Sequence, residues 1–407
     1  MKIILASVYP YAFMLLYLII PFDDYMRVLP NILLGILAVT FPFIVTKQDF
    51  KKLSRIPFLL FAFLFVYLLI NTLFTDRWDE DFKIIKKVFV VISLVLLYIP
   101  IQDFQKIHKA IIFSSLAAIL FSLTNLIILS ITSGNFELGN SPMVIEALLV
   151  DRLYLGLLAV ASILVSGQSI PRKYHPHNNY NLANIIVNIL FILIIGSKLA
   201  IALLILLAIV RQFYGKRRVV KVIAAMSLSI LVALFVFSLE KKHEGSNIQN
   251  FSALHKFVNS TMTWELRSEA WHCSHQIIEA EGLITTGFGF ENTKEKLIDC
   301  YNESIKDAVK REEFISERYN THNQFFDLYI GYGIVSVLLF LGFLLLVFWK
   351  SRKDYYSVAF LLSLIFYCLV ENLFHRQIGV YYMGLFLILL LIKNTEIQNN
   401  NPKTELK

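Results

Sequence analysis

Long apolar stretches recur along the chain from Ile3 to Ile392, separated by shorter polar segments. A helix needs about 20 apolar residues to cross a hydrocarbon layer of roughly 30 Å, and only helices or closed barrels satisfy their backbone groups in lipid. The pattern therefore predicts an all-α integral membrane protein. The apolar runs lie near residues 3–21, 28–45, 56–74, 88–101, 110–130, 152–167, 183–210, 219–238, 325–349, 355–374 and 380–392.

The run from Ala183 to Val210 is too long for one simple span. As a single helix it would measure about 42 Å at 1.5 Å per residue, and Gly196-Ser197-Lys198 lies at its middle. Lys and Arg collect in cytoplasmic loops, and a break at Gly196 puts the basic loop after this run on the same side as the basic loop at Lys47 to Arg55. The break predicts about twelve transmembrane helices, with both termini in the cytoplasm.

A polar stretch of 85 residues, Glu240 to Gln324, interrupts the apolar pattern, and this orientation places it outside. The predicted organisation is an N-terminal transmembrane bundle of about nine helices (1–238), a periplasmic loop region containing helices (239–324), C-terminal transmembrane helices (325–393) and a disordered cytoplasmic tail (394–407). One segment conflicts with the charge rule, because Lys83, Lys86 and Lys87 fall on the outer side.

Composition agrees with a membrane location: 57% of the residues are hydrophobic, 17% are charged and the mean hydropathy is +0.63. The formal net charge of +8 could suggest nucleic acid as a partner. The bias of Lys and Arg toward cytoplasmic loops explains that charge, so we expect membrane lipids around the spans and no nucleic acid.

Four cationic side chains fall at or near the outer membrane surface: Arg152, Lys198, Arg267 and Arg376. A positive charge among apolar helices usually faces the interior and has an anionic partner, so these residues outline an anion site. The alternative for each alone is snorkelling to the interface. On a predicted helix from Thr263 to Glu281, Arg267 and Trp271 are spaced i to i+4 and share one face, although a packed amphipathic surface helix would show the same spacing.

His322 lies a few residues before the apolar span that begins at Phe325. An imidazole titrates near pH 6.5 and can take a proton from a hydroxyl at neutral pH, so His322 is a candidate general base. Asn323 beside it could orient the ring or bind sugar hydroxyls. The alternative is an ordinary histidine at a helix end.

Four short patterns occur in order along the chain. They are Gly196-Ser197-Lys198-Leu199-Ala200, Arg267 with Trp271, Gly287-Phe288-Gly289, and His322-Asn323 followed, after nine intervening residues, by Gly333. Together they resemble the turn, the Arg-x-x-x-Trp segment, the Gly-x-Gly turn and the histidine motif of the O-antigen ligase and polymerase family of bacterial membrane glycosyltransferases. The resemblance spans roughly Arg152 to Phe386.

Two positions depart from the family pattern. Lys198 replaces the usual arginine, which keeps the charge but loses the bidentate geometry toward phosphate. Ser336 occupies a position where many ligases carry a second glycine. The segment Glu371 to Gln377 also resembles, less closely, the terminal acidic residue and Arg-Gln pair of the family.

The resemblance implies a GT-C-like fold in the bacterial inner membrane, with the active site on its periplasmic face. It implies transfer of a saccharide from undecaprenyl diphosphate to an acceptor hydroxyl, as on lipid A core or another glycan, with inversion and without a metal or cofactor. His322 and Arg267 would be catalytic, and Lys198, Arg152 and Arg376 would hold the diphosphate. Supporting roles fall to Asn323, Trp271, Gly287, Gly289, Gly333 and Glu371.

Other functions stay open. A repeat-unit polymerase for O-antigen or exopolysaccharide would use the same donor, and a relative could glycosylate a protein. A small-solute transporter would need polar residues facing a cavity at the membrane midplane, whereas the cations here gather at one face.

The cysteines and neighbouring histidines leave smaller questions. His272, Cys273 and His275 lie close together, but no second cysteine pair or spaced acidic ligand accompanies them, so zinc is disfavoured. Cys273 and Cys300 share the outer segment and could form a disulfide. Cys368 is expected to be a buried thiol.

Overall fold

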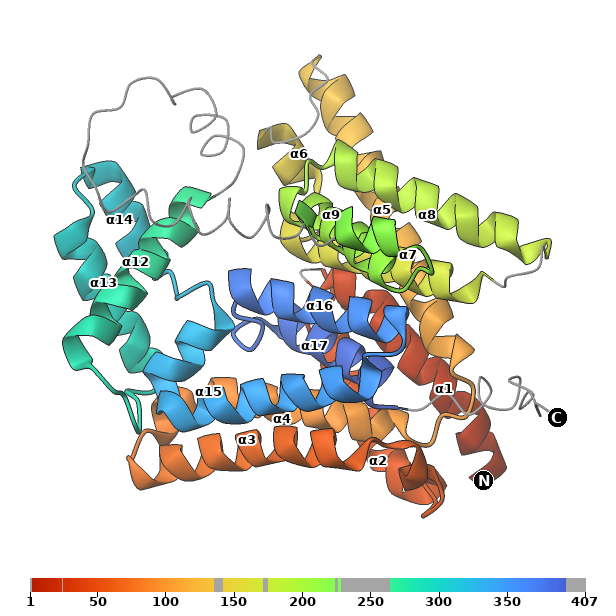
Figure 1. Ribbon diagram of the computed structural model, residues 1–407, viewed down its shortest axis with the longest axis horizontal. Coiled ribbons are helices and arrows are strands. Elements are labelled where there is room, and N and C mark those ends of the chain that lie inside the picture. The colour runs from red at the N-terminus through yellow and green to blue at the C-terminus, as the bar shows by residue number, and fades with distance from the viewer. Residues whose placement is uncertain are drawn as a thin grey trace.

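The computed structural model describes residues 2–23, 25–134, 142–170, 175–223, 226–227 and 264–392. Within these residues the fold is entirely helical (Figure 1). The α-helices are α1 (Lys2–Ile19), α2 (Leu29–Ile44), α3 (Arg55–Phe74), α4 (Trp78–Tyr98), α5 (Gln105–Ser133), α6 (Pro142–Ala147), α7 (Arg152–Ser169), α8 (His177–Ile194), α9 (Lys198–Phe213), α12 (Trp264–Glu281), α13 (Phe290–Ser304), α14 (Ala308–Ser316), α15 (Gln324–Ser351), α16 (Tyr355–Val370) and α17 (Gln377–Leu391).

The helices confirm the prediction of an all-α, multi-pass membrane protein. Five segments are long and apolar enough to cross a membrane: Ile3–Phe22, Arg55–Phe74, Gln105–Ser133, Arg152–Ser169 and Gln324–Ser351. Shorter apolar helices accompany them at Leu29–Ile44, Asn178–Ile194, Tyr355–Val370 and Gln377–Leu391. The predicted span at 219–238, part of the polar stretch (240–263) and the tail lie mostly or wholly outside the described residues, so the count of twelve stays a prediction.

The break predicted inside the run 183–210 is confirmed. Helix α8 ends at Ile194 and α9 begins at Lys198, with Gly196 between them in the left-handed region at φ +58°. Gly156 of α7 packs against this turn, and a Cβ there would lie 2.5 Å from Ser197 Oγ and 3.0 Å from Ala200 Cβ. The turn therefore needs a glycine opposite it, because any larger residue in α7 would push α9 away.

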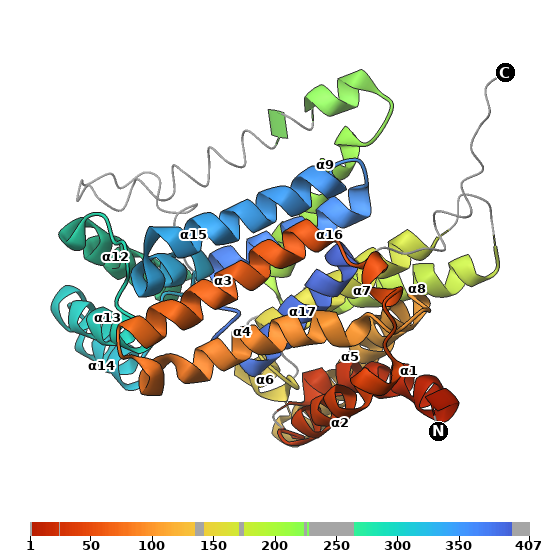
Figure 2. The ribbon, with the colours of Figure 1, turned by 90° about the horizontal axis from the view of Figure 1, so that it is seen from below.

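The membrane helices pack both on helices that are distant in sequence and on their neighbours along the chain. Helix α15 lies along α3, α17 lies along α4, and α7 packs on both α5 and α8 (Figures 1 and 2). Aromatic rings fill the α3–α15 contact, where the ring centroids of Phe61 and Phe343 are 5.1 Å apart. Many large apolar side chains on the outer faces of these helices are exposed, as expected for surfaces in contact with lipid tails.

A buried polar network joins α5, α7 and α8. The Asn184 amide donates to Ser162 Oγ at 2.9 Å and Ser166 Oγ at 2.8 Å, while Ser115 donates to Asn188 Oδ1 at 2.5 Å. Asn188 in turn donates to Asn184 Oδ1 at 3.0 Å. These side chains satisfy one another across the helices, so they favour a role in helix packing over lining a solute path.

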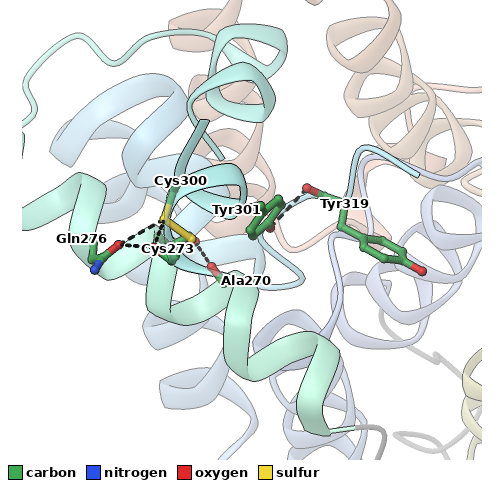
Figure 3. The surroundings of a disulfide bond; sticks show 8 residues. Ala270, Cys273, Gln276, Cys300, Tyr301 and Tyr319 are labelled. Carbon is green, nitrogen blue, oxygen red and sulfur yellow. Dashed lines mark hydrogen bonds between the residues drawn. A yellow bond between two sulfur atoms is a disulfide. The ribbon is translucent and has the colours of Figure 1, made fainter. Parts of the chain in front are cut away.

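The described part of the polar stretch forms a small helical unit at one end of the bundle, where α12, α13 and α14 gather (Figure 1); we call it the outer unit after its predicted location. Its core includes Ala270, Leu297, Tyr301 and Phe314. A disulfide between Cys273 of α12 and Cys300 of α13 confirms the pairing that the sequence left open (Figure 3). Cys273 is therefore unavailable to a metal, and in the described part of the chain no group of three or more metal-ligating side chains gathers.

The N-terminal half of α4, which carries the lysines that conflicted with the charge rule, lies at this same end. Asp81 Oδ1 accepts hydrogen bonds from the backbone of Phe290 at 2.7 Å and Glu291 at 3.3 Å, where α13 begins. Lys87 donates to the carbonyl of His375. This part of α4 therefore contacts both the start of α13, through Asp81, and the segment before α17, through Lys87.

Candidate active site

The outer unit is attached to α15 through backbone groups at an opening in that helix. Gly333 has φ +76° and ψ −177°, which breaks the helical ladder. Phe288 N then donates to Ile330 O at 3.0 Å and Gly289 N to Gly331 O at 2.7 Å, while Ile334 N donates to Ile284 O at 2.9 Å. The segment before α13 thus pairs with backbone N–H and C=O groups of α15 that would bond to each other in an unbroken helix.

This attachment explains two of the glycine patterns. A Cβ on Gly287 would lie 2.3 Å from Gly331 O, and one on Gly333 would lie 2.1 Å from Thr285 O. Gly289 has φ +91° and faces Asp81. Gly287, Gly289 and Gly333 therefore allow two backbones to approach closely, and their part in the site is to fix the outer unit on the helix that follows His322.

His322 itself is held in an uncommon backbone conformation, with φ +45°. Asn320 Oδ1 accepts a hydrogen bond from His322 N at 3.0 Å, and Trp271 Nε1 donates to His322 O at 3.3 Å. A non-glycine residue with positive φ costs free energy and persists only where its surroundings enforce it. These two contacts hold His322 in this conformation. The second comes from Trp271 of α12, and α12 confirms the predicted helix that carries Arg267 and Trp271.

Asn323 caps α15. Its Oδ1 accepts from Phe325 N at 2.9 Å and from Phe326 N at 3.2 Å. Because that oxygen already satisfies two of the unpaired amides at the helix start, it anchors the residue after His322.

The His322 ring faces a carboxylate from the other end of the chain. Nδ1 lies 3.4 Å from Glu371 Oε2, and Arg267 Nη2 lies 4.0 Å from the same oxygen. Arg267 also donates through Nε to Val370 O at 2.8 Å. Among the described residues, no group hydrogen-bonds to His322 Nε2, although that atom is buried. The imidazole is thus fixed through one nitrogen while the other has no protein partner.

Glu371 follows the end of α16, which stops at Val370, four residues before the predicted end of this span at 374. Burial by itself would raise the pKa of its carboxyl. The hydrogen bond with His322 and the electrostatic interactions with His322, Arg267 and Arg376 outweigh burial and lower that pKa to about 2. Glu371 is therefore ionised at neutral pH and favours the tautomer that carries its proton on Nδ1.

Two short segments, 321–327 and 371–376, bind each other residue by residue around this pair. Thr321 and Asn372 hydrogen-bond at 3.0 Å, Phe374 N donates to the side chain of Gln324 at 3.2 Å, and His375 Nε2 lies 2.8 Å from Asp327 Oδ2. Asp327 and His375 were not among the residues predicted for the site. An acidic residue in an apolar run is a detectable signal, because it needs a partner there.

The remaining cations lie around the same corner. Asp151 caps α7 by accepting from Leu153 N at 2.9 Å, and its other oxygen lies 3.1 Å from Arg376 Nη1. Arg152 and Lys198 begin α7 and α9. The charge of Arg152 interacts with those of both Arg267 and Lys198. Helix N-termini add partial positive charge, so this corner favours an anion.

Residues 183–341 match the family model described as O-antigen ligase. The chain contains an O-antigen ligase domain. No curated protein sequence matches the chain. The match confirms the family that the sequence patterns resembled.

The O-antigen ligase domain covers Lys198, Arg267, Trp271, His322 and the three glycines of the attachment. Arg152, Glu371 and Arg376 lie outside the matched range and reach the site through folding. The family match alone would not have brought Glu371 to His322, because 49 residues separate them.

Proposed function

We propose that the protein is a glycosyltransferase of the O-antigen ligase type. It transfers a saccharide from undecaprenyl diphosphate to an acceptor hydroxyl, for which lipid A core is the first candidate. The supporting observation is the His322 ring, whose Nδ1 faces ionised Glu371 while its buried Nε2 has no partner in the described part of the chain. A base must offer an unoccupied nitrogen to the proton it removes.

In the proposed reaction, the acceptor oxygen attacks the anomeric carbon as the bond from that carbon to the diphosphate oxygen breaks. The acceptor proton passes to His322 Nε2, and Glu371 stabilises the imidazolium that forms. A single displacement inverts the configuration at the anomeric carbon. Glu371 acts through His322, so it is a positioning residue in this scheme.

The leaving diphosphate gains negative charge as the bond breaks. Arg267, Arg152 and Lys198 offset that charge in the proposed mechanism, with Arg376 nearby but paired to Asp151. This assignment makes the transfer independent of a metal ion, and undiminished activity in the presence of a chelator would support it.

The proposed compartment is the periplasm, with the site at the outer face of the bacterial inner membrane. The disulfide between Cys273 and Cys300 supports this placement, because disulfides persist in oxidising compartments. The site lies against the outer unit, at the end where a lipid-linked donor and a membrane-bound acceptor would meet.

The decisive experiment uses purified protein in liposomes with an undecaprenyl-diphosphate oligosaccharide. Lipid A core and a second, non-transferable lipid-linked saccharide compete as acceptors. Core-linked product that disappears in His322→Ala supports the ligase. Lengthened lipid-linked chains would assign the repeat-unit polymerase instead, and absence of both products would overturn the proposal for these acceptors. His275→Ala is the matched control, because His275 lies on α12 and is half exposed, with Glu279 as its partner.

A further inference from the structure

An aromatic side chain that has no part in the reaction described above lies beside the proposed base. The ring centroid of Tyr319 is 5.8 Å from that of His322, and the two rings are tilted by 55°. Tyr319 packs on the core of the outer unit, yet its ring extends away from the Cys273–Cys300 disulfide (Figure 3). The residue is half-buried, so part of its ring is accessible to a molecule that enters from solution.

Several contacts hold this ring in place. Phe314 meets it edge-on, with ring centroids 5.0 Å apart and planes at 76°. The Tyr319 hydroxyl donates to Glu313 Oε1 at 3.3 Å, and the Tyr301 hydroxyl donates to Tyr319 O at 3.3 Å. A ring that is held at its edge, at its hydroxyl and at its backbone loses little further entropy when a ligand packs on its face.

The turn from Arg318 to Asn320 is fixed as well. Arg318 has φ +49°, and its Nη2 lies 3.0 Å from Glu291 Oε1 and 2.5 Å from Glu295 Oε1, both on α13. Asn320 Oδ1 accepts from His322 N, and in the described part of the chain no group accepts from Asn320 Nδ2. This turn therefore presents an aromatic ring and an amide donor beside His322.

An aromatic face next to an amide donor matches the chemistry of a sugar ring. The C–H groups on one face of a pyranose are apolar and carry a slight positive charge, which complements the negative face of an aromatic ring. The hydroxyl groups at its edge exchange hydrogen bonds with amides. A phosphate fits the ring less well, because Tyr319 offers no positive charge and the carboxylate of Glu313 borders it.

We propose that Tyr319 binds the acceptor by stacking on the ring of the sugar that carries the reacting hydroxyl. The inference rests on the proposed function, in which His322 Nε2 takes the proton of that hydroxyl. A sugar that hydrogen-bonds to the imidazole through one hydroxyl has its ring about 5 Å away, close to the separation between Tyr319 and His322. Stacking at that place would hold the acceptor oxygen in line with the anomeric carbon.

The first test removes the flat ring but keeps apolar volume. Tyr319→Leu is expected to raise KM for lipid A core about tenfold, the size of a lost stacking contact. KM for the undecaprenyl-diphosphate donor should stay unchanged, because the donor does not use this ring. Tyr319→Phe loses only the hydrogen bond to Glu313 and keeps the aromatic face, so its acceptor KM should equal that of the wild type.

A control variant separates stacking from packing. Leu297 is fully buried in the core of the same unit and has no aromatic face. Leu297→Ala should lower the unfolding temperature and leave the acceptor KM within about twofold, since its effect is a cavity in the core. Equal rises of the acceptor KM in Leu297→Ala and Tyr319→Leu would overturn the proposal, as would a Tyr319→Phe variant that is impaired as much as Tyr319→Leu.

A second measurement does not depend on turnover. Lipid A core is titrated onto the protein in nanodiscs without donor. The Kd is expected to be about tenfold higher for Tyr319→Leu than for the wild type and unchanged for Tyr319→Phe. An equal Kd in all three proteins would contradict the proposal.

The outcomes separate this inference from the proposed function. Transfer by the wild type together with an unchanged acceptor KM in folded Tyr319→Leu would overturn only the role of Tyr319. A raised KM for the donor alone would assign the ring to the donor saccharide, which also overturns it. Absence of transfer from the donor to either acceptor by the wild type would remove the proposed function, and the role of Tyr319 with it.

Discussion

Two histidine–carboxylate pairs lie on the same pair of interlocked segments, yet their surroundings differ. His322 faces Glu371 through Nδ1 and leaves its buried Nε2 without a partner among the described residues. His375 uses Nε2 to bind Asp327 at 2.8 Å, and the ring of Phe290 covers it edge-on at 5.5 Å. The two pairs thus differ in which ring nitrogen faces the carboxylate, and in the proposed reaction only Nε2 of His322 accepts the proton of the acceptor.

In the proposed reaction the His322–Glu371 pair supplies the base, whereas the His375–Asp327 pair supports the fold. His375 joins α4, α13 and α15 through Lys87, Phe290 and Asp327. It ties the outer unit to the membrane helices at a point where several elements meet. Substitutions in the two pairs should therefore give different combinations of lost activity and lost stability.

The largest expected effect on activity is that of His322→Ala. Loss of the base should lower kcat about 1,000-fold with little change in donor KM, since general-base catalysis contributes roughly 10²- to 10⁴-fold. Single-turnover transfer in liposomes measures it. The counterpart His375→Gln should keep kcat within about tenfold and lower the unfolding temperature, because it disrupts a buried hydrogen bond. Equal losses of kcat in the two folded variants would remove the distinction.

Glu371→Gln is expected to lower kcat about 100-fold while the protein stays inserted. The amide keeps the shape but loses the charge that stabilises the imidazolium. Asp327→Asn provides the control in the second pair. A kcat close to that of the wild type in folded Glu371→Gln would indicate that Glu371 has only a structural role.

Arg267→Lys should lower kcat/KM about tenfold or more. Arg267 directs Nε to Val370 O while Nη2 faces Glu371, and the ammonium of lysine cannot occupy both positions. Steady-state kinetics with varied donor measures the loss. Lys198→Arg serves as comparison and should retain activity, because it restores the residue of the family pattern. A normal rate for Arg267→Lys would assign Arg267 to packing.

The smallest effect on chemistry, and a large one on stability, is expected for Cys273→Ser combined with Cys300→Ser. Loss of the disulfide should destabilise the outer unit by about 3 kcal/mol, and thermal unfolding measures this. Turnover should fall only severalfold, because α12 still presents Arg267 and Trp271 but holds them less firmly. Unchanged unfolding temperature and unchanged turnover would show that the small core of this unit is sufficient alone.

Several features of the site follow from short stretches of sequence. The break at Gly196, the helix carrying Arg267 and Trp271, and the position of His322 just before α15 are local properties. Apolar runs, helical spacing and glycine conformations determine them. The sequence left open whether Cys273 and Cys300 form a disulfide, because spacing alone does not say whether two cysteines meet.

Other features depend on contacts between distant segments. Nothing in the local pattern shows that Gly287 packs on Gly331 or that Asp81 of α4 caps α13. Asn323 was a candidate for sugar binding from its place beside His322, and only the backbone geometry shows that its oxygen caps α15.

The amino-acid sequence by itself determined the membrane class, the helical architecture, the family and most residues of the candidate site. Those properties follow from apolar run length and from residue types at fixed local spacing. Tertiary structure alone decided which nitrogen of His322 is held, which carboxylate holds it, and which histidine binds Asp327. The reason is physical: a hydrogen bond depends on separations of a few ångströms, and between segments about 50 residues apart only packing of the helices determines those separations.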